Sequence, residues 1–551
     1  MARSALMISL QRAYKIAKAS IKTGIPTDEL IDIFQQKTTR RRLLYGGLGL
    51  ATAITTATWH GKGDSVAFAT IPKVLVVGAG IAGLTAAYRL YQAGVPVDII
   101  EARNRVGGRM RSLSNVAGTS ITVDLGGEFI DTDHTYLRSL AKELGLTTTD
   151  LREADKGLLQ ETWFFQGRKI PEKEIINYFI PLAKKIEQDL AFLGNEPINY
   201  RFHNQAALKL DNTSLAQYLE QAEINPILKQ MLRVAYTTEI GREPEELSCF
   251  NLIYLISTDT DKFEVYGTSD ERYQIVGGND QVPRLLAKSL ANFIETDTAL
   301  EAISIRPDNR YRVSFRSDAR TFQRTYERIL LTLPFSTLRL VSLNVNLPPI
   351  KQKAIAQLGY GTNSKLITAY TQRIWRTQYS ATAAIFTDTG FQNTWEATRS
   401  QPGSSGVITD YTGGQHGLSL GKGSAESQAQ ILLPQLEKIF PGISNLRQGE
   451  AIRAYWTGEE YTRGSYSCYL VGQVTGINGV AEETVGNLFF AGEHCSQEAQ
   501  GYMEGGCSTG EIAAMNILKD LGLKSTAAQQ KFRISTVKSQ KSRVKNFWTN
   551  D

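Results

Sequence analysis

The stretch Val76-Val77-Gly78-Ala79-Gly80-Ile81-Ala82-Gly83 decides the fold of this chain. The apolar run that ends at Val77 predicts a strand buried on both faces, and the glycines lead into a helix predicted over Leu84–Ala93. In such a turn Gly78 permits the tight bend, Gly80 lets the backbone approach a pyrophosphate, and Gly83 lets the helix pack on the strand. The free N–H groups at the start of the helix would face the phosphates, and Ile81 and Ala82 in the turn are also expected to contact the cofactor.

A second predicted strand, Val95–Ile100, ends at Glu101, where a carboxylate that binds the ribose of a dinucleotide belongs. Ala102 and Arg103 follow it. NAD and FAD both use this strand–turn–helix–strand unit, so these segments together predict a dinucleotide site without choosing between the two cofactors.

Two further segments favour FAD. Val106-Gly107-Gly108-Arg109-Met110-Arg111 offers a second glycine turn and a fixed cation that can close over a pyrophosphate, although such a segment can also be a solvated loop. Near the other end of the chain, a predicted strand, Asn487–Ala491, leads through Gly492-Glu493-His494 to a helix beginning near Tyr502. A helix N-terminus stabilises negative charge, as a reduced flavin requires.

These motifs resemble those of the flavin amine oxidase superfamily, which includes monoamine, polyamine and L-amino-acid oxidases, and the resemblance covers about Lys73–Leu523. It implies an α/β fold: a Rossmann-type FAD-binding domain (70–150, 264–330 and 480–523) with an inserted α+β substrate domain (151–263 and 331–479). It further implies FAD contacts from Gly126, Gly127 and Glu128 beside the flavin ring, from Glu493 at the ribityl chain, and from Ala302, Trp456 and Met503.

The resemblance also assigns the chemistry. Tyr466 and Tyr502 match the two walls of an aromatic cage that holds a neutral amine before flavin N5, and Lys365 matches a lysine that holds a water against N5. Ser465 stands where monoamine oxidases have the cysteine that bonds the flavin, so we expect FAD to be non-covalent. Cys468, three residues on, is expected to be a buried structural thiol.

Composition excludes several classes. Residues 1–69 carry ten Lys/Arg against four Asp/Glu, and residues 524–551 carry seven against one, whereas residues 70–523 carry 44 against 50. The net charge of +6 therefore lies in the terminal segments, and the catalytic body lacks the basic face that nucleic-acid binding needs. Four cysteines and five histidines show no metal-ligand spacing, so we expect no metal.

The N-terminal segment resembles a twin-arginine export signal. Arg40-Arg41-Arg42 precedes an apolar run, Leu43–Ala57, and Ala67-Phe68-Ala69 gives a cleavage pattern before the first strand. The expectation is export to the periplasm or an equivalent lumen, with a cytoplasmic protein bearing an arginine-flanked leader or tether as the alternative. The basic tail 524–551 is expected to be disordered.

The sequence therefore predicts an FAD-dependent amine oxidase that converts a primary amine to a carbonyl compound, with release of ammonia and hydrogen peroxide. Two alternatives remain: an L-amino-acid oxidase or dehydrogenase, and a desaturase or isomerase of the same fold. Phe129 stands where venom-type L-amino-acid oxidases have a carboxylate-binding arginine, whereas Glu128 and Asp131 either favour a cationic substrate or are solvated loop acids. The electron acceptor, oxygen or a quinone, and the oligomeric state, a homodimer included, stay open.

Overall fold

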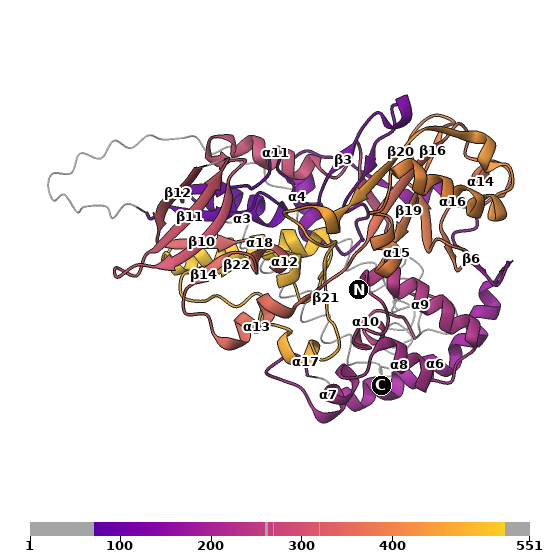
Figure 1. The fold of residues 1–551 in the computed structure, drawn as a ribbon, viewed down its shortest axis with the longest axis horizontal. Coiled ribbons are helices and arrows are strands. Elements are labelled where there is room, and N and C mark those ends of the chain that lie inside the picture. Colours follow the sequence, from indigo (N-terminus) through magenta and orange to yellow (C-terminus); the bar gives the residue numbers. More distant parts are fainter. Residues whose placement is uncertain (1–70, 195, 259–262, 268, 319, 524–551) are drawn as a thin grey trace, which may run out of the picture. The chain divides into compact units, whose positions relative to one another are not determined.

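The five-stranded parallel sheet that holds the glycine turn is drawn from segments far apart in the chain. The computed structural model describes residues 71–523, except 195, 259–262, 268 and 319 (Figure 1). The strand order is β22-β13-β1-β2-β9, with β1 at Val74–Val77, β2 at Val97–Ile100, β9 at Ile294–Glu295, β13 at Arg328–Leu331 and β22 at Leu488–Phe490. All four strand pairs are parallel, so the carboxyl ends of these strands meet at one edge, where open α/β sheets bind ligands.

Helix α3 (Ile81–Gln92) begins three residues earlier than predicted, because Gly80 is its N-cap. It packs against the C-terminal helix α18 (Met503–Asp520) in the same apolar core. Glycines make this approach close: a Cβ added to Gly510 would lie 2.4 Å from the carbonyl oxygen of Ala82, and one added to Gly506 would lie 2.7 Å from the side chain of Ile81. The first and last glycine-rich motifs are therefore adjacent in space (Figure 1).

A four-stranded sheet, in the order β12-β11-β10-β14, flanks the parallel sheet. It comprises β10 (Ala299–Ile305), β11 (Tyr311–Ser317), β12 (Arg320–Tyr326) and β14 (Ser342–Asn344). Because β14 pairs with β10, and Leu338 and Ile355 pack in the core shared with β1 and β13, the cofactor-side layer continues past the boundary predicted at residue 330.

The substrate side is a seven-stranded sheet over a group of helices (Figure 1). Its order is β20-β16-β19-β18-β17-β6-β7, with strands β6 (Thr162–Phe165), β7 (Arg168–Lys169), β16 (Ser364–Tyr370), β17 (Ile385–Thr387), β18 (Asn393–Glu396), β19 (Gly406–Thr412) and β20 (Arg447–Tyr455). The helices are α6 (Glu172–Leu193), α7 (Gln205–Asp211), α8 (Leu215–Gln221), α9 (Pro226–Ile240) and α10 (Phe250–Ile253). Two strands, β6 and β7, thus precede the helices in this part of the chain.

Short elements complete the described part. The paired strands are β3 (Ser112–Leu113) with β4 (Val123–Asp124), β5 (Thr148–Asp150) with β8 (Tyr273–Ile275), and β15 (Gly359–Tyr360) with β21 (Ser467–Cys468). The remaining helices are α4 (Thr135–Glu143), α5 (Leu151–Ala154), α11 (Gln281–Ser289), α12 (Phe335–Leu338), α13 (Pro349–Gln357), α14 (Ile374–Thr377), α15 (Gly414–Ser419), α16 (Ala425–Ile439) and α17 (Val474–Ile477).

Within residues 71–523, no described helix combines the length and apolarity that crossing a bilayer requires. The predicted export signal and the basic tail lie outside the described residues.

Candidate active site

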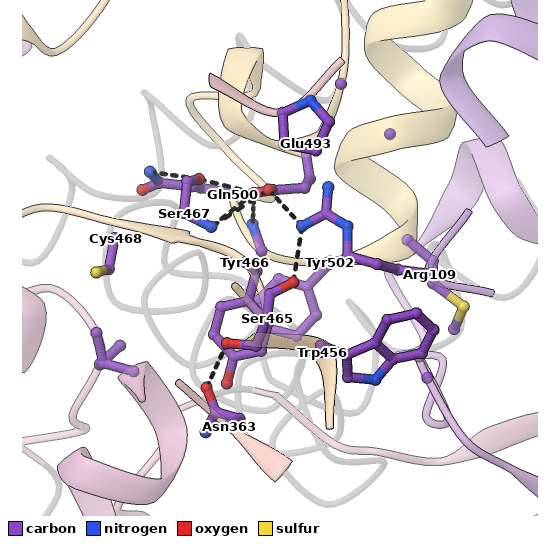
Figure 2. Close-up of a pocket in the computed structure, with 18 of the residues that line it drawn as sticks. Arg109, Asn363, Trp456, Ser465, Tyr466, Ser467, Cys468, Glu493, Gln500 and Tyr502 are labelled. Atoms are coloured by element: carbon purple, nitrogen blue, oxygen red, sulfur yellow. Dashed lines mark hydrogen bonds and ion pairs between the residues drawn. The ribbon is translucent and has the colours of Figure 1, made fainter. Parts of the chain in front are cut away.

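A cavity of about 1820 Å³ runs from the carboxyl edge of the parallel sheet to the seven-stranded sheet. Single-ligand pockets are typically 300–1,000 Å³, so this one has room for a dinucleotide and a substrate together. Figure 2 shows its central part, where Arg109, Trp456, Tyr466, Glu493 and Tyr502 converge.

The residues predicted to bind a dinucleotide surround one end of the cavity. Glu101, 5 % exposed, accepts hydrogen bonds from the backbone N–H of Ala79 at 2.9 Å and of Arg103 at 3.0 Å. The carboxylate therefore stands directly beside the glycine turn. Gly80 has no atom within 4 Å of the position that a Cβ would take, so open space lies where a pyrophosphate would approach.

Gly126 and Gly127 form a close-packed floor beside Trp456 and Met503. A Cβ on Gly126 would lie 1.7 Å from the carbonyl oxygen of Arg109, and one on Gly127 would lie 2.6 Å from the Met503 side chain. Trp456 donates its Nε1–H to the carbonyl oxygen of Leu125 at 3.1 Å. A flat ring system fits against this floor, and together with the glycine turn and Glu101 the donor set suits FAD. We therefore expect these residues to hold it.

Arg109 and Glu493 form an ion pair of 2.9 Å at the centre of the cavity, in which Glu493 is buried and Arg109 is half-buried. Arg109 also donates to the carbonyl oxygen of Ser465, and Glu493 accepts from the hydroxyl of Ser467 and the N–H of Gly501. Although burial opposes ionisation, the positive charge of Arg109 holds the pKa of Glu493 below its ordinary value. The pair ties the 465–467 segment to the N-terminus of α18.

Most of the predicted site residues line this one cavity: Gly78, Gly80, Ile81, Ala82, Glu101, Ala102, Arg103, Gly108, Arg109, Gly126, Gly127, Glu128, Lys365, Trp456, Tyr466, Gly492, Glu493, Tyr502 and Met503. Gly83 lies behind the turn, where a Cβ would meet the Gly78 carbonyl oxygen at 2.0 Å, so its role is packing. Ala302 was misplaced. A bulge shifts the register of β10 after Leu300, and the cavity is lined instead by Thr298, Ala299, Leu300 and Glu301.

Lys365 on β16 uses all three ammonium protons within the protein. Its Nζ donates to the carbonyl oxygens of Asp124 at 2.9 Å and Gly126 at 2.8 Å, and to Glu128 Oε2 at 2.7 Å. Glu128 Oε1 accepts from the indole of Trp395 at 3.0 Å. Glu128 is therefore neither a solvated loop acid nor free to attract a cationic substrate, because Lys365 neutralises it.

Tyr466 and Tyr502, the two predicted cage residues, both line the cavity and are drawn in its central part in Figure 2. Tyr466 Oη lies 2.9 Å from Tyr411 Oη and also donates to the carbonyl oxygen of Glu239. Tyr502 Oη donates to Glu239 Oε1 at 3.3 Å. Because burial raises the pKa of both cage tyrosines well above the ordinary value, both phenols stay neutral.

Aromatic side chains extend the cage on the seven-stranded sheet. Trp395 packs against Phe129 and Tyr411 at ring-centroid distances of 5.3 Å and 5.1 Å. Arg399 lies over the Phe129 ring at 5.0 Å, but it pairs with Asp155 at 3.2 Å and is not among the residues that line the cavity.

Among the acids on the cavity wall that sequence reasoning missed, three have a raised pKa: Glu161, Glu239 and Glu271. Surrounding protein atoms raise the pKa of Glu161, whose side chain is open to the cavity, and of the half-buried Glu239 to about 7. Burial, with Glu239 and Asp131 nearby, raises the pKa of Glu271 to about 8. They come from three separate segments and match no motif, so only the fold brings them together. Asp131, 5 % exposed, accepts from Ser269 and from the Glu271 N–H.

Ser465 and Cys468 bear on how the flavin is held. Ser465 donates its hydroxyl to Asn363 Oδ1 at 2.7 Å, and no thiol stands at that position. Cys468 also lines the cavity, but burial raises the pKa of its thiol to about 12. Such a thiol is a poor nucleophile, and non-covalent FAD remains our prediction.

The geometry fits a flavin-dependent oxidoreductase whose predicted amine site is lined by aromatic side chains of the protein. Comparison with known proteins identifies the family. Residues 81–518 match the model of the family described as flavin containing amine oxidoreductase, and the chain belongs to this family. Its members are FAD-dependent enzymes that act on amines, as the sequence predicted.

Among curated proteins, the chain is 24 % identical to a flavin-containing amine oxidase of Oncorhynchus mykiss over 459 residues, covering 82 % of this chain and 86 % of the relative. It is likewise 24 % identical to flavin-containing amine oxidase B of Homo sapiens over 458 residues, with the same coverage. Among solved structures, it resembles cyclohexylamine oxidase from Brevibacterium oxydans IH-35A (TM-score 0.71, 21 % identity, 82 % and 99 % coverage). It also resembles putrescine oxidase bound to putrescine (TM-score 0.69, 20 % identity, 81 % and 99 % coverage).

Proposed function

We propose that this protein oxidises a primary amine that carries a second cationic group. The reacting amine lies between Tyr466 and Tyr502, and the second cation lies against Glu271 and Glu161. The observation that carries the proposal is that these two carboxyl groups line the cavity and form no ion pair with a Lys or Arg within the described residues. Arg399 lies near enough to lower the pKa of Glu271, but its ion pair is with Asp155.

The charge balance of the wall supports a cationic ligand. The carboxyl groups of Glu161, Glu239 and Asp131 lie near enough to Glu271 to raise its pKa. Neighbouring acids that repel one another ionise most readily when a cation lies between them. Glu271 also adopts a left-handed backbone conformation, with φ of 40°, which is uncommon for a residue other than glycine and occurs at functional sites.

The same wall disfavours an α-amino acid. A substrate carboxylate would need a cation, but Lys365 is paired with Glu128 and Arg399 is paired with Asp155. A basic L-amino acid would satisfy Glu161 and Glu271 through its side chain and leave its carboxylate without a partner. Oxidation of such amino acids is the alternative that the experiment below distinguishes.

Each group then has a role in oxidative deamination. When bound, FAD would supply the two-electron acceptor: the neutral amine would give up a hydride and become an iminium ion, which water would hydrolyse to a carbonyl compound and ammonium. Oxygen would take the two electrons together with two protons and form hydrogen peroxide. The faces of Tyr466 and Tyr502 orient the neutral amine. Lys365 and Glu128 hold the 124–128 segment. The aromatic wall of Phe129, Trp395 and Tyr411 excludes water.

The test is anaerobic flavin bleaching with matched substrates: 1,4-diaminobutane against n-butylamine, 1,5-diaminopentane against n-pentylamine, and L-lysine. We expect the diamines to have the higher kcat/KM. Glu271→Gln and Glu161→Gln should each lower the diamine-to-monoamine ratio about tenfold or more, because a hydrogen bond to a charged group contributes about 1.5–3 kcal/mol. Glu153→Gln, at an exposed position, is the matched control. An unchanged ratio in both folded, FAD-loaded variants would refute the second-cation site, and bleaching by L-lysine alone would favour the amino-acid alternative.

Location is a separate proposal that rests on residues outside the described part. We infer export through the twin-arginine route from Arg40–Arg42 and Ala67–Ala69. N-terminal sequencing of protein from the native cell should give a start near Thr70, and a start at Met1 or Ala2 would reject export.

A further inference from the structure

Hydrogen bonds join the last turn of α9 to Asn363 and to both cage residues, Tyr466 and Tyr502. The final carbonyl groups of a helix have no partners within the helix. Here the oxygen of Thr237 accepts from the N–H of Gly241 at 2.9 Å, that of Thr238 accepts from Asn363 Nδ2 at 2.5 Å, and that of Glu239 accepts from the Tyr466 hydroxyl. Asn363 in turn accepts from Ser465. The helix end, the start of β16 and the segment before Tyr466 therefore form one unit.

Glu239 contacts the hydroxyls of both cage rings, but through different groups. Its main-chain oxygen accepts from Tyr466, and its side-chain Oε1 accepts from Tyr502 at 3.3 Å. The two rings come from segments 36 residues apart in the sequence. Glu239 thus joins rings that no shared strand or helix holds together.

We propose that Glu239 is a positioning residue that sets the spacing of the amine cage, with its main chain fixing Tyr466 and its carboxylate fixing Tyr502. The proposal rests on amine oxidation at the cage and is independent of the second-cation site. It predicts that substitution of the carboxylate loosens Tyr502 alone, because the main-chain bond to Tyr466 survives any side-chain change.

The strength of the hydrogen bond between Tyr502 and the Glu239 side chain depends on whether the Glu239 carboxyl group is ionised. A carboxylate accepts a shorter and stronger hydrogen bond from a phenol than a neutral acid does. Burial, with the negative charge of Asp131 nearby, raises the pKa of Glu239 to about 7. The hydrogen bond from Tyr502 to Glu239 therefore strengthens as the pH rises through neutrality and the carboxyl group ionises. The titratable groups whose charge interacts with Glu239 are Asp131, Tyr236, Tyr266, Glu271, Tyr411, Tyr466 and Tyr502.

The test measures the limiting rate of anaerobic flavin reduction in FAD-loaded variants with the best amine substrate. Glu239→Ala and Tyr502→Phe should each slow reduction by about tenfold, and the double variant should be no slower than either. Tyr466→Phe loses a different bond, so its effect should multiply with that of Glu239→Ala. Glu239→Gln keeps an acceptor and should be faster than Glu239→Ala, but the rise in rate near pH 7 should vanish. Glu220→Gln, exposed on α8, is the matched control.

Multiplying effects of Glu239→Ala and Tyr502→Phe, or a pH step that persists in Glu239→Gln, would overturn the proposal. A second measurement needs no turnover. In protein labelled with ¹³Cζ-tyrosine, the resonance lost in Tyr502→Phe should shift with pH near neutrality, and it should not shift in Glu239→Gln. If no amine reduces the flavin, the proposed function fails, whereas the resonance still supports or refutes Glu239.

Discussion

Replacement of Lys365 by methionine tests the buried ion pair between Lys365 and Glu128. The Lys365 and Glu128 side chains are only 6 % and 4 % exposed, so Lys365→Met leaves a buried carboxylate without a cation. It also removes the donor to the carbonyl oxygens of Asp124 and Gly126. Removal of one partner of a buried pair costs about 3–5 kcal/mol. We expect a loss of this size in the free energy of unfolding at pH 7.

The pH dependence of that loss follows from linkage. An orphaned buried carboxylate escapes its unpaired charge by taking up a proton, which costs about 1.4 kcal/mol for each pH unit above the ordinary glutamate value of about 4.3. Protonation at pH 7 therefore costs about 4 kcal/mol, and at pH 5 only about 1 kcal/mol. The variant should lose less stability in acid than at neutral pH, and Lys365→Met/Glu128→Gln should recover most of the loss.

Urea unfolding at pH 5, 6 and 7 measures these differences, and stopped-flow spectroscopy measures the half-reactions. Since Lys365 is predicted to hold a water at flavin N5, Lys365→Met should leave anaerobic reduction mostly intact and slow reoxidation by oxygen. All three ammonium protons are engaged, so this role requires one of them to be released to the water. A loss under about 1 kcal/mol that does not vary with pH, with no rescue by Glu128→Gln, would refute the reasoning about the ion pair.

The remaining predictions concern the cofactor and the core. Acid precipitation should release FAD into the supernatant, and flavin retained in the pellet would show a covalent bond. Gly80→Ala should leave the fold intact and weaken FAD binding, whereas Gly83→Ala should destabilise the fold, because its Cβ would lie 2.0 Å from a carbonyl oxygen; calorimetry and flavin titration compare the two. Asp410 is buried on β19 with Oδ1 unpartnered, and burial raises its pKa to about 8. The folded state therefore holds that proton and loses stability as the pH rises from about 4 to 8, so Asp410→Asn should raise Tm more at pH 8 than at pH 5, and an equal change at both would contradict this.

The cofactor side could be predicted because its chemistry imposes local patterns. A turn that admits a pyrophosphate needs glycine at fixed spacing, and the strand–turn–helix around Gly78–Gly83 forms as the sequence indicates, apart from the start of α3. The Gly492–Met503 segment likewise leads from β22 to α18. Ala302 was misplaced because a bulge alters the register of β10, and a bulge leaves no sign in composition.

The substrate side resisted prediction because its residues meet only through tertiary packing. Glu161 directly precedes β6, Glu239 lies in the last turn of α9, and Glu271 precedes β8. Each alone resembles an ordinary surface glutamate. Lys365 likewise neutralises Glu128 only because the fold brings β16 into contact with the 124–128 segment. Whether an acid attracts a substrate is set by its partners, and partners distant in sequence cannot be predicted from one sequence.

The packing of α3 on α18 has a consequence for biosynthesis. Arg89 Nε and Glu511 Oε1 are 2.7 Å apart, although 422 residues separate them in the chain. At about 5–20 residues per second, the ribosome needs roughly 20 to 85 seconds to make the second partner after the first. During that interval the glycine turn lacks the helix that completes its pocket, and the apolar face of α3 is uncovered. Cofactor capture is therefore an event of the finished polypeptide, and nascent chains need protection from association until then.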